Sequence, residues 1–315
     1  MSYHILHITT PGVVLYCEKG FLFCKYTDGN ENKIPVADLR SLIIATHQVT
    51  FTNSCLARLL ENDVVILHCN DKYQPTGWSA GLDKVIRKEA FFKQIARNTA
   101  LEYSLWQKIL RQKILNQLDN LELLGCPEHD IDKLLECPAI SEGNVAKKYW
   151  QKYFETFGLH INREHQDAEV FENICLNYGY AVISTLLYRS ILTHGLLPNL
   201  GIQHKARYNS TPLVYDFVEP FRAFVDFYLK KFAENCAEDY QKQALKSWNK
   251  YLAGCLKNYR LKARGLSYKI IDFCDVYVES FINALLHDEA DKIILPKLKA
   301  QYLHIDKHRN REYEE

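Results

Sequence analysis

The stretch GLLPNLGIQHKARYNSTPLVYDFVEPFRAFVD, residues 195–226, joins a broken loop to the start of a helix. Gly195, Pro198 and Gly201 interrupt regular structure, because glycine is permissive of unusual backbone angles and proline lacks an amide hydrogen. The residues that follow, including His204, are polar. We therefore predict a turning, exposed loop that carries a histidine.

A helix with an unusual polar face follows this loop. Thr211 and Pro212 match an N-cap followed by the first position of a helix. Four charged residues then recur at spacings of three or four and share one side of the helix: Asp216, Glu219, Arg222 and Asp226. Pro220 removes the amide that would bond back to the carbonyl of Asp216, so we expect the helix to be interrupted there.

Two explanations fit this polar face. Charged residues at such spacing are most often a solvent-exposed helix face, whose ion pairs contribute about 0.2–0.5 kcal/mol each. A single loop histidine is also usually a surface residue. The alternative is a metal pocket in which the carboxylates and His204 share an ion. This stretch alone favours the solvent-exposed face, and a metal site needs a third ligand from elsewhere in the chain.

Glu142 is the candidate for that third ligand. It begins a helical segment that Ser141 can cap, and it lies in the first turn, where the helix dipole favours an anion. That position alone is a sufficient explanation. However, Glu142 also heads the apolar stripe of the segment, which comprises Val145, Tyr149, Trp150, Tyr153 and Phe157. An unpaired buried carboxylate is costly, and a metal ion would satisfy it.

The bulk composition indicates a folded globular protein and excludes several classes. Hydrophobic residues make up 47% of the 315 residues and charged residues 24%, and the length suggests two domains. Ten scattered cysteines without a CxxC pair argue against a zinc ribbon or a disulfide scaffold and suit free thiols in the cytoplasm. We find no signal peptide, and the longest apolar stretch, 178–192, is too short and polar to cross a bilayer, so no membrane association is expected.

The pattern along the chain predicts the α+β class. Residues 1–75 are β-rich, with short runs of β-branched and aromatic residues at 3–8, 13–17, 21–26, 39–45 and 64–69, and one short helix that Asn53 could cap. Clustered proline and glycine predict a linker over 76–83. Residues 84–315 follow helical periodicity, with 84–118 forming a long helix or a helical hairpin. We therefore expect a small N-terminal β-rich domain and a larger all-α C-terminal catalytic domain.

Local basic clusters are the candidates for a nucleic-acid surface, since the net charge of +1 gives none for the whole chain. Residues 239–264 interleave cations with aromatic side chains, and we select Lys246, Lys250, Lys257 and Arg260. Lys205 and Arg207, beside His204, are placed to contact phosphates. Basic residues over 84–97 form a second cluster. A solvent-exposed face explains each of these groups as well.

Three blocks together resemble a known family: EGNVAKKYW at 142–150, GLLPNLGIQH at 195–204 and DFVEPFRAFVD at 216–226, with NYGY at 177–180 before the second. In this order they resemble the integrase of CRISPR adaptation, the Cas1 family. IPVADL at 34–39 and LLENDVVIL at 59–67 are similar to that family's β-domain. Asn209, between His204 and Asp216, is more similar to the members found in type II systems.

The resemblance implies a divalent metal bound by Glu142, His204 and Glu219, with Asp216 as a supporting acid. One departure is the pair Ile202-Gln203, where the family often has an aromatic and an aliphatic residue. Two carboxylates and one imidazole suit Mg²⁺ or Mn²⁺, and the nitrogen ligand favours Mn²⁺. Without a cysteine ligand, structural zinc is not expected.

The activity that the resemblance implies is DNA integration in antiviral defence. A double-stranded DNA fragment would be inserted into the repeat DNA of a CRISPR array by attack of its 3′-hydroxyl on a phosphodiester. The same resemblance implies a homodimer formed through the β-domains and a Cas2 partner protein. Two alternatives remain open: a metal-dependent nuclease acting on branched or single-stranded DNA without integration, and an inactive DNA-binding scaffold.

Overall fold

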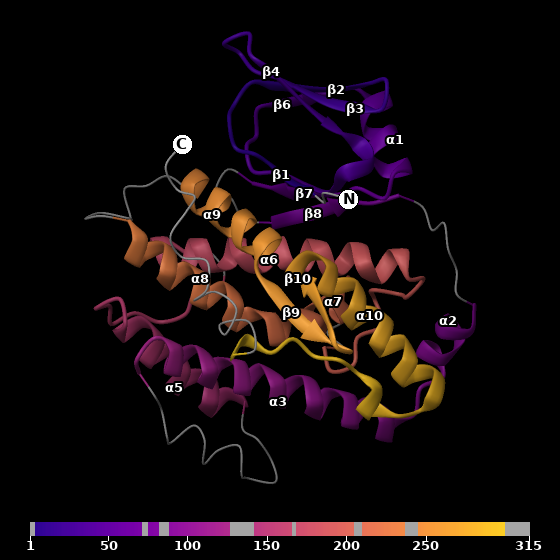
Figure 1. Ribbon diagram of the computed structural model, residues 1–315, viewed down its shortest axis with the longest axis vertical. Coiled ribbons are helices and arrows are strands. Elements are labelled where there is room, and N and C mark those ends of the chain that lie inside the picture. Colours follow the sequence, from indigo (N-terminus) through magenta and orange to yellow (C-terminus); the bar gives the residue numbers. More distant parts are fainter. Residues whose placement is uncertain are drawn as a thin grey trace.

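Figure 1 shows a computed structural model of the chain that describes residues 4–70, 75–81, 88–126, 142–165, 168–204, 210–236 and 245–299. Strands gather in the N-terminal part, and helices make up most of the remainder. The predicted α+β class is therefore confirmed.

Two four-stranded sheets form the N-terminal part. One has the order β4-β3-β2-β6, with bounds Glu31–Pro35, Phe21–Lys25, Val13–Glu18 and Val49–Phe51. The other has the order β1-β5-β7-β8, with bounds His4–Ile8, Leu39–Ile44, Val65–Cys69 and Pro75–Ser79. Within it β1, β5 and β7 are parallel and β8 is antiparallel to β7. The short elements η1 (Val36–Asp38) and α1 (Asn53–Glu61) connect the two sheets.

Both faces of the sheet that contains β5 are buried. Leu42 and Ile44 pack into the core of the N-terminal part, whereas Ile43 and Leu67 pack into the large core of the helices. Parallel strands that are apolar on both sides require cover on both faces. The partner on which these strands pack is α6 of the same chain.

Local sequence explains the ends of these elements. Lys19 and Gly20 both adopt positive φ in the two-residue turn between β2 and β3, as a hairpin of this length requires. The N-cap of α1 is Thr52, whose hydroxyl accepts a hydrogen bond from the amide of Cys55 at 3.2 Å. The prediction that Asn53 caps this helix is wrong, because Asn53 is its first residue.

Strand β8 occupies part of the segment that we predicted as a linker, 76–83. Trp78 explains why this segment is ordered: its Nε1 donates to Thr185 Oγ1 at 3.1 Å, and its ring stacks on Tyr188. Pro75 is the first residue of an edge strand, a position that tolerates proline. Residues 76–79 are therefore strand.

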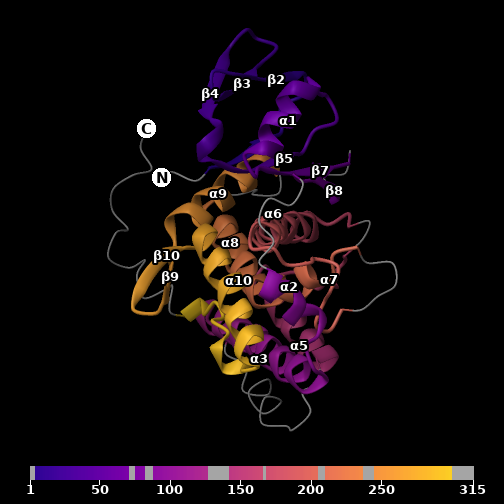
Figure 2. The same ribbon diagram turned by 90° about the vertical axis from the view of Figure 1, so that its right-hand side faces the viewer.

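The remaining elements are mostly helices arranged around α6 (Figure 2). They comprise α2 (Lys88–Ile95), α3 (Thr99–Leu123), α5 (Glu142–Glu155), α6 (Phe171–Thr193), α7 (Pro212–Val218), η2 (Glu219–Phe221), α8 (Arg222–Asn235), α9 (Leu245–Asn258), α10 (Ile270–His287) and η4 (Ala290–Lys292). The described part of 84–118 is two helices and not one long helix, because Asn98 caps a new helix with a bond from the amide of Leu101 at 2.7 Å.

A β-hairpin lies inside the region that was expected to be entirely helical. It consists of β9 (Arg260–Ala263) and β10 (Leu266–Lys269), which pair antiparallel. Arg264 and Gly265, the two residues of its turn, both have positive φ, at 49° and 75°. Such a turn matches the natural twist of two antiparallel strands. The C-terminal part is therefore helical with one β-hairpin, and not all-α as expected.

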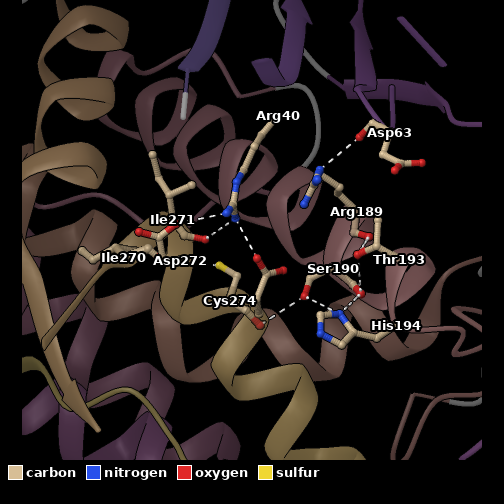
Figure 3. Close-up of polar contacts among 11 residues, drawn as sticks. Arg40, Asp63, Arg189, Ser190, Thr193, His194, Ile270, Ile271, Asp272 and Cys274 are labelled. Carbon is tan, nitrogen blue, oxygen red and sulfur yellow. Dashed lines mark hydrogen bonds and ion pairs between the residues drawn. The ribbon is translucent and has the colours of Figure 1, made fainter. Parts of the chain in front are cut away.

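Charged contacts fix the strands to the helices (Figure 3). Arg40 of β5 lies 2.7 Å from Asp275 and 3.1 Å from Asp272, both in the first turns of α10. From the other side, Arg189 of α6 donates from Nε to the carbonyl of Asp63 at 3.0 Å. These contacts hold the sheet and the helices in one arrangement.

Candidate active site

Four segments distant in sequence meet at one place. Glu142 is the first residue of α5, Glu219 begins η2, and His204 lies in the loop before α7. Helix α3 packs against α5, α7 and η2 and so joins them. The break at Pro220 is as expected: α7 ends at Val218 and a short 3₁₀ turn leads into α8.

Lys113 of α3 connects the two predicted glutamate ligands. Its Nζ lies 2.6 Å from Glu142 Oε1 and 2.6 Å from Glu219 Oε2. The side chain of Lys113 is 11% exposed, that of Glu219 is 4% exposed, and that of Glu142 is 44% exposed. The structure therefore brings Glu142 and Glu219 together around one buried ammonium group.

Glu219 is kept ionised although it is buried. Burial alone would raise its pKa, but the positive charges of Arg222 and Lys113 lower the pKa below its usual value. Arg222 Nη2 lies 3.0 Å from Glu219 Oε1. The polar face of this helix is thus a buried ion-pair network, and the solvent-exposed explanation is wrong for Asp216, Glu219 and Asp226.

Asp216 holds His204 in a defined orientation. Its carboxylate accepts hydrogen bonds from His204 Nδ1 at 2.6 Å and from the amides of Ile202, Gln203 and His204 at 2.5, 3.2 and 3.1 Å. Since a carboxylate only accepts, Nδ1 carries the proton and Nε2 of the neutral ring is left for a ligand. The bond to Asp216 also raises the pKa of His204 above its usual value, against the effect of burial.

The loop that carries His204 has little free space. A Cβ added to Gly201 would lie 2.3 Å from the carbonyl oxygen of His204 and 3.0 Å from Asp216 Oδ2. Trp106 packs edge-on against the imidazole with ring centroids 5.9 Å apart. At the departure from the family pattern, Ile202 is buried and Gln203 is exposed, while the amides of both bind Asp216. The backbone amides of Ile202 and Gln203, and not their side chains, make the contacts with Asp216.

His204 and Glu219 lie close enough for the charge of each to shift the pKa of the other. Within the described residues, however, no three His, Cys, Asp or Glu side chains are arranged as a ready metal cluster. The candidate ligands are engaged by other groups: Glu142 and Glu219 by Lys113, and His204 by Asp216. The donor set still fits a divalent cation, because two carboxylates already flank one cation and Nε2 of His204 is an additional donor.

Sequence reasoning placed Asp226 on the polar face but did not identify what it binds. Its carboxylate accepts hydrogen bonds of 2.5 Å from the hydroxyls of Tyr149 and Tyr180. Burial raises the pKa of Asp226 to about 6, although these bonds and two arginines act in the opposite direction. The Arg222 guanidinium lies 4.9 Å from the centre of the Tyr180 ring. This network continues the ion pairs of Glu219 into the protein core.

Lys113 itself was missed, although the sequence carries a signal for it. It belongs to a polar stripe that α3 buries, which comprises Gln112, Lys113, Asn116, Gln117 and Asn120. Their spacing of one, four, five and eight positions describes one face of a helix. One member, Asn116, donates to the carbonyl of Pro220 at 2.6 Å and so supports the helix break. His165 is a second missed residue: partial burial and the charges of Arg163 and Arg222 lower its pKa to about 4, and the charges of Glu219 and Lys113 also act on it.

Three of the predicted DNA-binding residues, Lys250, Lys257 and Arg260, lie apart from this site. Lys250 and Arg260 are exposed on α9 and β9, and burial lowers the pKa of the partly buried Lys257. Figure 2 shows α9 and the hairpin on the side of the helical part opposite to α7. Lys205, Arg207 and the type II marker Asn209 lie outside the described residues, as does the side chain of Lys246. These assignments stay predictions.

Comparison with known proteins gives a consistent family match. Residues 6–245 match the family model described as CRISPR associated protein Cas1. A CRISPR-associated endonuclease Cas1 from Neisseria meningitidis is 30% identical over 207 residues, which is 63% of this chain and 66% of the relative. A second, from Saccharolobus solfataricus, is 27% identical over 237 residues, which is 73% of this chain and 75% of the relative.

Solved structures share the fold at lower identity. A casposase bound to an integration product aligns with a TM-score of 0.80 and 18% identity, over 96% of this chain and 94% of the other. A chain of a Cas6-RT-Cas1–Cas2 complex aligns with a TM-score of 0.73 and 16% identity, over 94% of this chain and 36% of the other. At such identities the likeness shows a common fold.

Proposed function

The chain belongs to the CRISPR-associated protein Cas1 family, and from this premise we propose that it inserts short DNA fragments into a CRISPR array. The observation that carries the proposal is that Lys113 brings Glu142 and Glu219 together, with His204 close enough to Glu219 for their charges to interact. The proposed reaction is a transesterification. The 3′-hydroxyl of the fragment forms a new bond to a phosphorus atom of the repeat while the bond to the neighbouring nucleotide breaks, so no nucleotide cofactor is consumed.

Glu142, Glu219 and Nε2 of His204 would hold the Mg²⁺ or Mn²⁺ ion. When bound, such an ion polarises the phosphodiester and makes an attacking hydroxyl more acidic. The protein's own contribution is positioning. Asp216 fixes the tautomer and direction of His204, and Arg222 keeps Glu219 ionised inside the protein. Carboxylate–histidine pairs of this kind orient the ligands of metal sites.

The partners follow from the same premise. Double-stranded DNA fragments and the repeat are the substrates, and the casposase likeness, solved with an integration product, supports this choice. A Cas2 protein and a second copy of this chain complete the assembly, and the likeness to a chain of a Cas1–Cas2 complex supports the first of these. No described helix combines the length and hydropathy that a bilayer span requires. All nine described cysteines are free thiols, which supports a place in the cytoplasm.

The decisive experiment supplies duplexes with free 3′-hydroxyls, a plasmid with a CRISPR repeat, Mn²⁺ and the partner protein. We expect the wild-type protein to join fragment to plasmid, and both Glu219→Gln and His204→Ala to lose joining by at least about a hundredfold. Both variants should still bind the fragment in a fluorescence anisotropy assay, because affinity comes from many phosphate contacts.

Each other outcome would assign a different activity to this protein. Cleavage of the plasmid without joining indicates a nuclease. Joining or cleavage that Glu219→Gln leaves unchanged indicates that the chemistry lies elsewhere. A protein that binds DNA but neither joins nor cleaves it is a scaffold. A folded His204→Ala protein that loses DNA binding as well would contradict the separation of binding from catalysis.

A further inference from the structure

Lys113 lies where a lysine is costly to bury. It projects from α3, its side chain is 11% exposed, and its helical neighbours Ile109 and Ile114 belong to the apolar core. A buried ammonium group persists only when it is paired and hydrogen-bonded. Glu142 and Glu219 provide that pairing, each at 2.6 Å from Nζ.

These carboxylate oxygens are the same atoms that a divalent ion would need. A magnesium or manganese ion binds carboxylate oxygens at about 2.0–2.2 Å, which is shorter than either contact of the ammonium group. One oxygen pair cannot hold both cations in one place, because their positive charges would repel at short range with little solvent between them. Binding of the metal must therefore displace Nζ from at least one of the two glutamates.

We propose that Lys113 is a built-in substitute for the metal, a positioning residue that neutralises Glu142 and Glu219 until a divalent ion replaces it. The inference rests on the proposed function, since it needs a metal at this site. Its consequence is that the metal-free protein is stable and that the metal is bound less tightly than the ligands alone would allow. The displaced ammonium group stays on the wall of the site, where a DNA phosphate is the anion it can pair with.

The test measures Mn²⁺ affinity directly, from the free-ion signal in electron paramagnetic resonance. In Lys113→Met the competing cation is gone and two carboxylates face each other without a partner. We expect the dissociation constant for Mn²⁺ to fall by about tenfold or more, because the metal no longer breaks a buried ion pair. A lysine that only supported the site would give the opposite result, since its loss would loosen the ligands and weaken binding.

Thermal unfolding gives a second readout that does not depend on activity. In EDTA, Lys113→Met should unfold at a lower temperature than the wild-type protein, and Mn²⁺ should raise its unfolding temperature by more than it raises that of the wild type. Lys113→Arg keeps a cation and should not bind Mn²⁺ more tightly. Lys108→Met is the matched control: it is on the same helix and pairs with Asp291 at 2.5 Å, away from the site, and should leave the affinity unchanged.

The outcomes separate this inference from the proposed function. If Lys113→Met binds Mn²⁺ as weakly as the wild type or more weakly, or if Mn²⁺ raises both unfolding temperatures equally, Lys113 is not a substitute for the metal. If the wild type binds no Mn²⁺, or binds it as well as Glu219→Gln does, the metal site itself is wrong. If Lys113→Met does not fold, tighter binding by Lys113→Arg would still overturn the inference.

Discussion

At the scale of single residues, Asp216 is fully engaged by protein donors. Four hydrogen bonds reach its two oxygens, so it orients His204 and is not itself free to bind a metal. We predict that Asp216→Asn lowers Mn²⁺ affinity by about 10- to 100-fold, the usual effect of removing a partner of a metal-binding histidine. Titration with Mn²⁺ measures it. Asp291→Asn, at the surface, is the control, and an unchanged affinity in Asp216→Asn would refute the orienting role.

The same bond predicts a pH dependence. A metal binds only the neutral imidazole, and the bond to Asp216 raises the pKa of His204 above 6.5. Protons therefore compete with the metal from a higher pH than for an ordinary histidine. Mn²⁺ affinity should fall as the pH drops through that raised value, and the fall should begin at lower pH in Asp216→Asn. A midpoint that does not move between the two proteins would contradict this.

Asp226 gives a prediction about stability. Its pKa is raised from 3.8 to about 6, so its favourable contribution is complete below pH 3.8 and is lost as the pH rises through 6. The loss amounts to about 3 kcal/mol of unfolding free energy. Urea unfolding at several pH values should show that the wild type loses this amount relative to Asp226→Asn, which does not titrate. Parallel curves for the two proteins would show that Asp226 keeps an ordinary pKa.

Part of the arrangement around Lys113 was predictable at this scale, whereas its binding of a metal stays a prediction. The spacing of Asp216, Glu219 and Asp226 placed them on one face, and the polar loop before them supplied His204. Their burial was not predictable, because charged residues at that spacing are usually exposed. Lys113 lies 29 residues from Glu142 and 106 from Glu219 in the chain, so no local pattern connects the three. Only the packing of α3 against α5 and η2 does so.

At the scale of elements, the β9–β10 hairpin presents cations on one side. Arg260, Lys262 and Arg264 are exposed, whereas Leu261 and Ala263 between them are buried. Arg264 keeps a positive φ, which a residue other than glycine adopts at some cost, so the turn places a cation at the tip. The only facing carboxylate that the described contacts give it is Glu279, at 3.9 Å.

We predict that this hairpin contributes to DNA binding. Replacing Arg260, Lys262 and Arg264 by alanine should weaken the binding of duplex fragments and reduce the slope of log affinity against log salt by about 0.9 for each phosphate that the variant no longer neutralises. Anisotropy titrations at several salt concentrations measure the slope. Replacing Lys231 and Lys292, which are paired on other surfaces, is the control. An equal slope in the hairpin variant and the wild type would show that the hairpin is an ordinary exposed surface.

Sequence patterns located long elements better than short ones. The runs at 13–17, 21–26 and 39–45 coincide with strands to within a residue or so, and the apolar run 178–192 lies inside α6. Strands β4, β6, β8 and the β9–β10 hairpin were missed because their pairing partners, not their own composition, make them strands. Gly265 was the one local signal for the hairpin turn.

At the scale of the whole molecule, Arg40 is the main charged contact between sheet and helices. Its side chain is 10% exposed, and it pairs with Asp272 and Asp275. We predict that Arg40→Met lowers the free energy of unfolding by about 2–3 kcal/mol, less than the cost of breaking a fully buried pair, because both carboxylates are partly exposed. Urea unfolding measures this. Lys33→Met, an exposed cation over the Phe21 ring, is the control. A decrease no larger than that of the control would show that apolar packing alone joins the two parts.

The double-sided sheet has a consequence for how the chain is made. Ile5, Ile43 and Leu67 face α6, which ends at Thr193. On the ribosome, the first strands emerge more than a hundred residues before the helix that covers them. During that interval the hydrophobic face of this sheet is exposed to other nascent chains and to chaperones. The N-terminal sheet therefore completes its burial only after α6 has been synthesised, so the strands and the helices fold as one unit.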